Sequence, residues 1–157
     1  MRNVTVEAGS QPADYSRWIA VCCGAMIAAF YVVGLVSGTE LRHFVQTLPL
    51  WLGVILGIRR IQVTRWLAMP MFLFWLFVMV LIWLFLLGWA HVVSGHFSPI
   101  EIFMTLVIGI ASVLGVTFCV RDRGRAKPTV VMAAVLIGAV LQLIAFQVSL
   151  LPEIARR

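Results

Sequence analysis

Long runs of apolar residues, separated by short polar segments, dominate the pattern along the chain. Four of these runs reach or exceed the roughly 20 residues that a helix needs to cross about 30 Å of hydrocarbon. They lie at 18–37, 66–90, 100–120 and 129–151. Each run is therefore predicted to form a transmembrane helix.

A fifth apolar segment, 44–58, is shorter than the other four and contains Pro49. Basic residues flank it on both sides, with Arg42 before it and Arg59 and Arg60 after it. Long basic side chains at helix ends can extend to the membrane surface, so that a short segment can still span. We therefore expect a fifth span, with a half-membrane or interfacial helix as the alternative.

Composition agrees with a membrane location. The chain is 62% hydrophobic and 11% charged, with a mean hydropathy of +1.05, and so has too few polar residues to cover a soluble globule. The predicted fold class is all-α, a polytopic transmembrane helix bundle. Its single domain covers 18–151, between a mobile polar N-terminal tail, 1–17, and a short C-terminal tail, 152–157.

The distribution of Lys and Arg predicts the orientation of the spans. Segment 59–65 carries three arginines and segment 121–127 carries three arginines and a lysine, whereas 91–99 carries neither residue type. Short loops rich in Lys and Arg stay on the cytoplasmic side. We expect 59–65 and 121–127 to be cytoplasmic and 91–99 to be external, in a protein of the bacterial inner membrane. Topology then explains the net charge of +6 without a nucleic-acid partner.

The polar stretch between the third and fourth long runs contains signals for helix ends. Ser98, Pro99 and Glu101 have the spacing of a capping box, with serine at the N-cap, proline at the first helical position and glutamate reaching back to the cap. Upstream, Gly95 is typical of the residue that follows a helix. The third span is therefore expected to end near Val93.

Three histidines and one glutamate are predicted to lie at the external surface, where they could form a metal site. Imidazole and carboxylate groups bind zinc and other divalent ions, and two histidines could hold a haem iron. No spaced motif such as HExxH supports such a site, so no cofactor is expected, with haem or a divalent metal as the alternative. The candidate ligands are His43, His91, His96 and Glu101.

Small residues recur at intervals of three or four positions on three of the predicted helices. In a bilayer such positions mark the faces where helices approach closely, so these faces are expected to point inward. The candidate helix-packing positions are Gly53 and Gly57 on the second span, Ala111 and Gly115 on the fourth, and Ala134, Gly138, Gln142, Ala145 and Ser149 on the fifth.

The sequence favours a function that depends on contacts within the membrane rather than on catalysis. Ion-coupled pumps and proton relays place ionisable residues inside the bilayer, whereas the middles of the four longest runs have none. The favoured function is a small integral membrane protein without catalysis of its own, an accessory subunit that packs in the lipid bilayer with itself as a homo-oligomer or with a larger membrane protein. Two alternatives are a small-solute transporter or channel formed by an oligomer, and a membrane redox or metal-dependent enzyme that uses the external His/Glu cluster.

Overall fold

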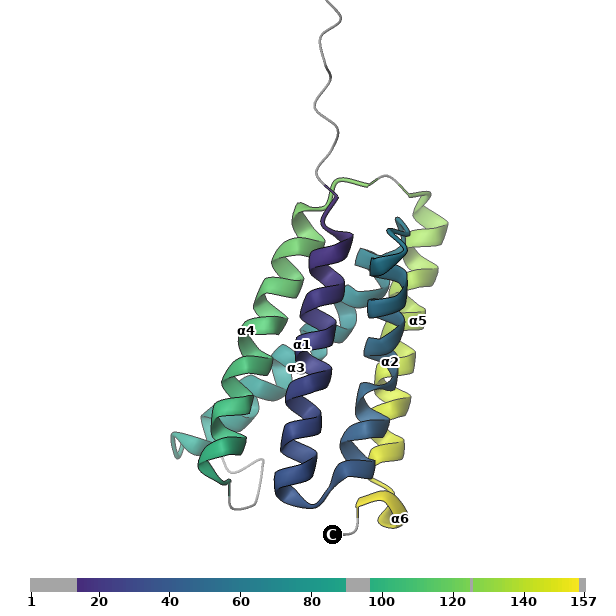
Figure 1. Ribbon diagram of the computed structural model, residues 1–157. Helices are drawn as coiled ribbons and strands as arrows, with labels where there is room; N and C mark the ends of the chain where they lie inside the picture. Colours follow the sequence, from purple (N-terminus) through teal and green to yellow (C-terminus); the bar gives the residue numbers. More distant parts are fainter. Residues whose placement is uncertain (1–13, 90–96, 125, 156–157) are drawn as a thin grey trace, which may run out of the picture.

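The computed structural model describes residues 14–89, 97–124 and 126–155. Over these residues all regular secondary structure is helical, and five of the helices are long and apolar enough to cross a membrane (Figure 1). The prediction of an all-α bundle with five spans is therefore confirmed. The helices are α1 (Ser16–Ser37), α2 (Glu40–Ile58), α3 (Thr64–Leu86), α4 (Pro99–Arg121), α5 (Pro128–Ser149) and the short α6 (Pro152–Ala155).

The second span begins earlier than the apolar run that predicted it. Gly38 ends α1 in the left-handed conformation, with φ of 65°, and α2 starts two residues later at Glu40. An acidic residue in the first turn is favourable at the positive end of the helix dipole. The helix continues through Pro49 and has 19 residues, so that it is about 28 Å long. This length is close to that of a full span, as the five-span prediction requires.

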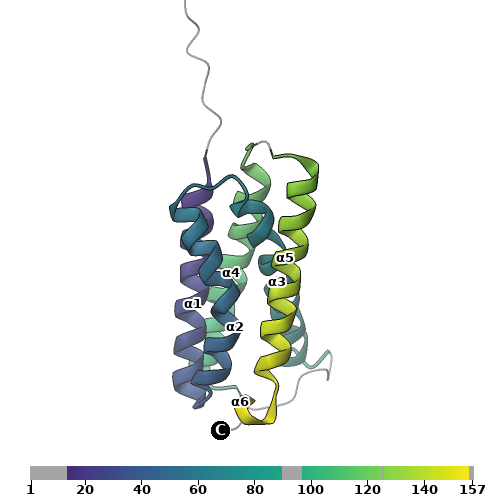
Figure 2. The same cartoon turned by 90° about the vertical axis from the view of Figure 1, so that its right-hand side faces the viewer.

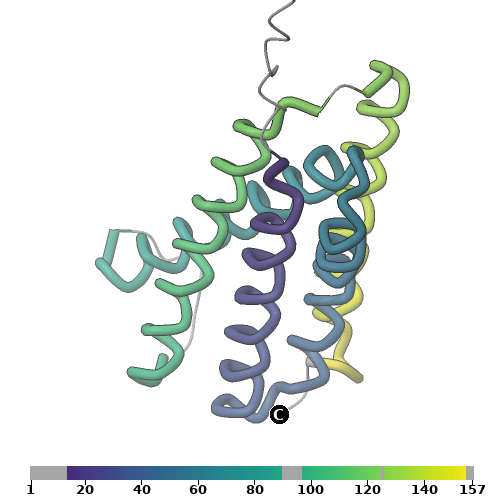
Figure 3. The backbone as a smooth tube through the Cα atoms, turned by 45° about the horizontal axis from the view of Figure 1, so that its top comes forward, coloured from purple at the N-terminus to yellow at the C-terminus, as the bar shows by residue number. Residues whose placement is uncertain are grey.

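The five long helices form a closed ring. In order around the ring, α1 packs against α2, α2 against α5, α5 against α3, α3 against α4, and α4 against α1 (Figures 1 and 2). Helix α3 also touches α1 and α2 across the ring, and it crosses the bundle obliquely, so that its last part lies beside α4 and away from α5 (Figure 3).

The ring has two chemically different ends. We call the end where α2 stops and α3 starts the arginine end, because Arg59, Arg60, Arg65, Arg121 and Arg123 lie there. It is at the top of Figure 1, together with the start of α1. The opposite end, where α1 turns into α2 and α4 begins, is called the histidine end because it contains His43.

Large apolar side chains fill the ring. Phe72 and Met71 of α3 are fully buried, and the Trp75 ring packs 4.4 Å from Phe30 of α1 and 6.3 Å from Phe146 of α5. The outward positions are also apolar, as at Phe77, which is 61% exposed. Apolar side chains on the inside and the outside are what a bilayer environment requires.

The third helix ends earlier than expected. It stops at Leu86 rather than near Val93, because Gly88 adopts a left-handed conformation with φ of 74°. The N–H of Gly88 donates to the carbonyl of Phe85, and the N–H of Trp89 donates to the carbonyl of Leu84. These bonds satisfy carbonyls that the end of a helix otherwise leaves free. Gly95, the expected stop signal, lies outside the described residues.

The ends of the described chain also differ from the expected tails. Helix α1 begins at Ser16, two residues before the apolar run, where the Asp14 carboxylate accepts the backbone N–H of Ser16 at 3.0 Å. Beyond α5, the segment Pro152–Ala155 forms the short helix α6, which packs against α2 and α5. Both tails therefore contribute a few ordered residues to the bundle.

Candidate functional site

His43 is held at the start of α2 by the turn that precedes it. Its Nδ1 lies 3.0 Å from both the hydroxyl and the carbonyl oxygen of Thr39, and its ring packs 5.9 Å from that of Phe30. A carbonyl can only accept, so Nδ1 carries the proton of the neutral imidazole. The free acceptor is then Nε2, the atom that a ligand or metal ion would meet.

Glu101 caps α4, as the sequence predicted. The backbone N–H of Ser98 donates to Oε2 of Glu101 at 2.6 Å, and the backbone N–H of Glu101 donates to the Ser98 hydroxyl at 3.3 Å. The predicted capping box is therefore confirmed. One carboxylate oxygen of Glu101 is thus engaged by the cap.

Two of the four predicted metal ligands, His43 and Glu101, lie at the histidine end, at the starts of α2 and α4. The other two, His91 and His96, lie outside the described residues. Within residues 14–89, 97–124 and 126–155, no group of three or more His, Cys, Asp or Glu side chains is placed to hold a metal ion.

The small residues of α2 and α4 lie where neighbouring helices approach. A Cβ added at Gly53 would lie 2.7 Å from Sγ of Cys23, and one at Gly57 would lie 2.6 Å from the carbonyl oxygen of Ser16, both on α1. A Cβ at Gly115 would lie 2.6 Å from the ring of Phe72 on α3. Ala111, one turn before Gly115, is buried as well. These positions therefore face other helices of the same chain.

The stripe of α5 is the buried face of that helix. Its five residues are those of α5 that are buried: Ala134, Gly138, Gln142, Ala145 and Ser149. At Gly138, the place of a Cβ is filled by the carbonyl oxygen of Leu67 and by Cγ of Pro70, so the backbones of α5 and α3 meet there. Near the histidine end, Gln46 of α2 donates to the hydroxyl of Ser149 at 3.0 Å. The stripe thus holds α5 against both α3 and α2.

Gln142 is the exceptional member of the stripe. It is fully buried, and neither its amide oxygen nor its amide nitrogen has a hydrogen-bond partner among the described residues. The indole N–H of Trp75, which is also buried, has no partner there either. A buried polar group without a partner costs about 1–3 kcal/mol, so an amide at this place would gain from a polar molecule within reach.

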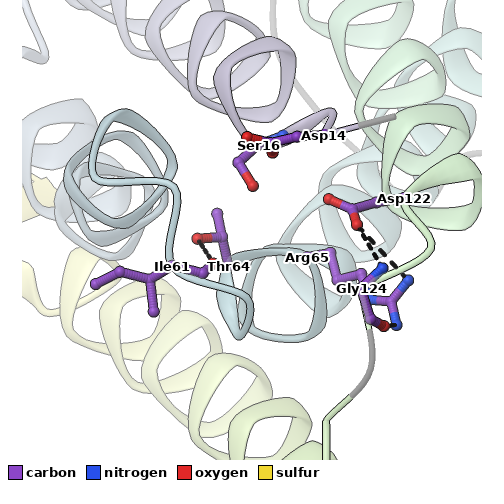
Figure 4. A network of polar contacts seen from close by, with 7 residues as sticks. All are labelled: Asp14, Ser16, Ile61, Thr64, Arg65, Asp122 and Gly124. Atoms are coloured by element: carbon purple, nitrogen blue, oxygen red, sulfur yellow. Dashed lines mark hydrogen bonds and ion pairs between the residues drawn. The ribbon is translucent and has the colours of Figure 1, made fainter. Parts of the chain in front are cut away.

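A polar network closes the arginine end. Arg65, at the start of α3, lies 3.9 Å from the carboxylate of Asp122 and donates to the carbonyl of Gly124 (Figure 4). Its guanidinium also stacks 4.4 Å from the centre of the Trp66 ring. Both charged side chains of this pair are only 12% exposed. The network therefore ties the α2–α3 connection to the α4–α5 connection.

A second ion pair lies at the same end. Arg60 is 3.6 Å from the carboxylate of Asp14, and both side chains are partly exposed. The hydrogen bonds from Ser16, followed by the charges of Arg60 and Arg17, hold the pKa of Asp14 below its usual value. Both described acidic residues of the arginine end are thus paired with an arginine.

Sequence reasoning missed these pairs. It used the basic residues of the two loops only to predict the orientation of the spans, and it did not consider Gln46. The available signals were Asp122 within an otherwise basic segment and a glutamine in the shortest apolar run. Neither signal identifies the partner, which comes from a distant part of the chain.

The exposed cations at the arginine end form a basic surface. Asp14 and Asp122 are already paired with Arg60 and Arg65, and no further acidic side chain lies at this end among the described residues to neutralise the other cations. We define the basic surface by its exposed residues: Arg17, Arg59, Arg60, Arg121, Arg123 and Lys127.

Comparisons of the chain with family models, curated proteins and solved structures gave no match.

Proposed function

We propose that the chain is a small integral membrane protein without catalysis of its own, which acts as an accessory subunit of a larger membrane-protein assembly. One observation carries the proposal: polar groups inside the described spans are mostly used within the chain. The hydroxyls of Thr47, Thr105 and Ser112 donate to carbonyls of their own helices at 2.9, 2.7 and 2.8 Å. Such bonds leave few groups for acid–base or nucleophilic chemistry.

The basic surface is the part of the molecule best suited to a partner. The small-residue faces are occupied by helices of the same chain, which leaves the charged ends and the outer apolar faces for other proteins. Clustered arginines favour carboxylate-bearing partners, because the guanidinium group binds carboxylates with two hydrogen bonds. We therefore infer a larger membrane protein with an acidic cytoplasmic segment as the partner, with a homo-oligomer as the alternative.

Cross-linking in native membranes tests this proposal. The tagged chain is cross-linked in the membrane through amines and carboxylates and then purified in denaturing detergent. We expect one other membrane protein in a fixed ratio to the chain. Reversing the charges of Arg121 and Arg123 to glutamate should lower its recovery about tenfold, whereas the control Glu153→Lys at the opposite end should not. Recovery of the chain alone, or with copies of itself only, would refute the proposed partner.

Sidedness is part of the same proposal. The rule that Lys-rich and Arg-rich loops stay inside favours a cytoplasmic arginine end in the bacterial inner membrane. A single reporter cysteine is placed at Ser94 or at Gly124 in a chain whose native cysteines, Cys22, Cys23 and Cys119, are replaced. A membrane-impermeant thiol reagent added from outside should label the first reporter only. Labelling of the second reporter alone would reverse the orientation.

Gln142 gives a reason to keep a transporter as the second candidate. A fully buried amide without a partner is a group that a passing polar solute could contact. Flux of small polar solutes is measured in proteoliposomes containing the wild-type chain or Gln142→Leu. The accessory-subunit proposal expects background flux from both proteins and greater stability of the leucine variant. Flux that the leucine variant abolishes would favour transport.

His43 and Glu101 keep a metal or haem site as the third candidate. With Nδ1 bonded to Thr39, the Nε2 atom of His43 has the donor chemistry of a divalent-metal or haem ligand, and Glu101 at the same end supplies a carboxylate. Metal analysis and visible absorbance of the purified chain test this, with His43→Ala as the control. A stoichiometric metal or haem that is lost in the variant, with helix content retained, would assign a redox or metal-dependent enzyme instead.

A further inference from the structure

We propose that the part of the basic surface beside α1 and α2 binds the phosphate of an anionic phospholipid. Its cations are Arg17 at the start of α1 and Arg59 and Arg60 at the end of α2, and all three are exposed. The site requires only that the helices span a bilayer, and it does not depend on the accessory function proposed above. The cations beside α4 and α5, on which the cross-linking experiment acts, remain available to the proposed protein partner.

The packing of α1 against α2 brings these cations to one place. A Cβ at Gly57 would lie 2.6 Å from the carbonyl oxygen of Ser16, so the last turn of α2 touches the first turn of α1. Just beyond this contact, Arg60 lies 3.6 Å from the carboxylate of Asp14, which precedes α1. Three arginines thus share this end of the α1–α2 pair with one described carboxylate, which leaves an excess of two positive charges.

Arg60 occupies a backbone position that favours glycine. Its φ is 52°, and the N–H groups of Arg60 and Ile61 donate to the carbonyls of Gly57 and Leu56, both at 3.1 Å. These bonds form the Schellman motif, in which the left-handed residue is usually glycine. A side chain at this position raises the free energy of the turn relative to glycine. The turn itself therefore does not explain why the residue is an arginine.

The pair with Asp14 leaves the guanidinium group of Arg60 open to a further ligand. Nε of Arg60 is 3.6 Å from the carboxylate, which is longer than a hydrogen bond, and the two side chains are 53% and 42% exposed. Ion pairs that are this exposed contribute little to stability. A guanidinium group has five N–H donors, whose arrangement suits the oxygens of a phosphate. Arg60 can therefore bind a phosphate from outside while Asp14 remains beside it.

Exposed apolar side chains next to the arginines favour a lipid over a soluble anion. Ile58 and Ile61 flank the two arginines of α2 in the sequence and are 64% and 39% exposed. Segment 122–127, between α4 and α5, has alanine as its only apolar residue. Lipid phosphates lie directly outside the hydrocarbon core, and a cation beside an exposed isoleucine at the end of a span lies at the same depth. A phospholipid supplies a phosphate for the arginines and an acyl chain for the isoleucines, and cations at a membrane surface attract anionic lipids.

Native mass spectrometry of the full chain tests the proposal. The chain is purified in a non-ionic detergent and titrated with phosphatidylglycerol or with phosphatidylcholine, which carries the same acyl chains but no net charge. One charge near an anionic surface corresponds to about fivefold in binding, so an excess of two charges should make phosphatidylglycerol bind about 25-fold more tightly. Equal binding of the two lipids would overturn the proposal.

Two double variants that remove the same charge locate the site. Arg59→Gln/Arg60→Gln should abolish the preference for phosphatidylglycerol, whereas Arg123→Gln/Lys127→Gln, on the α4–α5 side, should retain most of it. An equal loss in both variants would mean that the lipid responds to the net charge of the whole end, and it would overturn a site beside α1 and α2.

Arg60→Gly separates lipid binding from a structural role. Glycine is favoured at this position of the turn, so the variant should be at least as stable as the wild type. It should nevertheless bind phosphatidylglycerol about fivefold more weakly, because one charge is lost. Unchanged lipid binding, whatever the stability of the variant, would refute the role of Arg60.

Two further measurements exclude other occupants. Glycerol phosphate, at constant ionic strength, should not displace phosphatidylglycerol, because it lacks the acyl chain that the isoleucines would contact; displacement at similar concentrations would assign the site to soluble phosphate compounds. Arg59→Gln/Arg60→Gln is also cross-linked in native membranes, where the proposed protein partner should still be recovered. Loss of that partner, without a lipid preference of the purified wild-type chain, would assign this side to the partner and overturn the lipid site.

Discussion

Gly138 is predicted to be the position of α5 that least tolerates a side chain. A Cβ there would lie closer than 3.0 Å to the carbonyl oxygen of Leu67, at 3.0 Å from Cγ of Pro70 and at 3.1 Å from the carbonyl carbon of Leu67. Two of these three atoms belong to the backbone of α3, which cannot rotate away as a side chain could. In Gly138→Ala, α5 must therefore move outward, along an interface that also buries Gln142.

The expected magnitude follows from two opposing effects. Alanine raises helix propensity by about 1 kcal/mol over glycine, and overpacking of a tight contact costs about 1–3 kcal/mol. Gly24, on α1, is the matched control because a Cβ there would meet nothing within 4 Å. The propensity gain is common to both substitutions and cancels in their difference. The free energy of unfolding of Gly138→Ala should therefore lie about 1–3 kcal/mol below that of Gly24→Ala.

Unfolding in mixed micelles of dodecyl maltoside and SDS, followed by tryptophan fluorescence, measures this difference. Circular dichroism before unfolding checks that both variants start with the same helix content. Equal unfolding free energies for the two alanine variants would refute the close approach of α5 to α3. A larger loss for Gly138→Leu would support it, because a longer side chain requires a greater displacement.

Three further predictions concern the ends of the bundle. Arg65→Lys should lower the free energy of unfolding by about 1.5–3 kcal/mol, because lysine cannot both pair with Asp122 and stack on the neighbouring indole. Equal stability of the variant and the wild type in the mixed-micelle assay would contradict this. Glu101→Ala should destabilise α4 by about 0.5–1 kcal/mol. Glu101→Gln should cost less, because glutamine can still accept the N–H of Ser98, so the same assay should give the glutamine variant the higher free energy of unfolding. The pKa of Asp14 is lower in the folded protein, so its stabilising effect is complete above its unfolded pKa and is lost as the pH falls through its folded pKa. Asp14→Asn should therefore flatten the acid side of the stability profile, and an unchanged profile would argue against the hydrogen bonds from Ser16 and the pair with Arg60 as stabilising contacts of the carboxylate.

The spans and the start of α4 could be predicted because their signals are local. A hydrocarbon slab demands about 20 apolar residues in a row, and a capping box needs only Ser98 and Glu101 at the right spacing. The early end of α3 was also encoded locally, in Gly88. It was missed because the apolar run continues past the glycine. In a membrane protein, a helix can end before the apolar run that contains it ends.

The polar pairs could not be predicted, because each joins residues from distant segments. Arg65 and Asp122 are separated by an entire hairpin of spans, and Gln46 and Ser149 lie on the second and fifth helices. The residues around one member of a pair give no information about where in the sequence the other member lies. Composition indicates only that a buried charge or amide needs a partner. Which partner it finds depends on the order of helices around the ring.

The glycines of α4 show where reading small residues as packing sites reaches its limit. Gly109 and Gly115 lie in the same apolar helix, and each has a bulkier apolar side chain beside it in the sequence. A Cβ at Gly115 would meet the ring of Phe72, whereas a Cβ at Gly109 would meet nothing within 4 Å. The difference arises because six positions separate the two glycines, which places them on different faces of the helix, and only Gly115 is on the buried face. A glycine in a membrane helix therefore marks a close contact only where the helix face that carries it is packed against another helix.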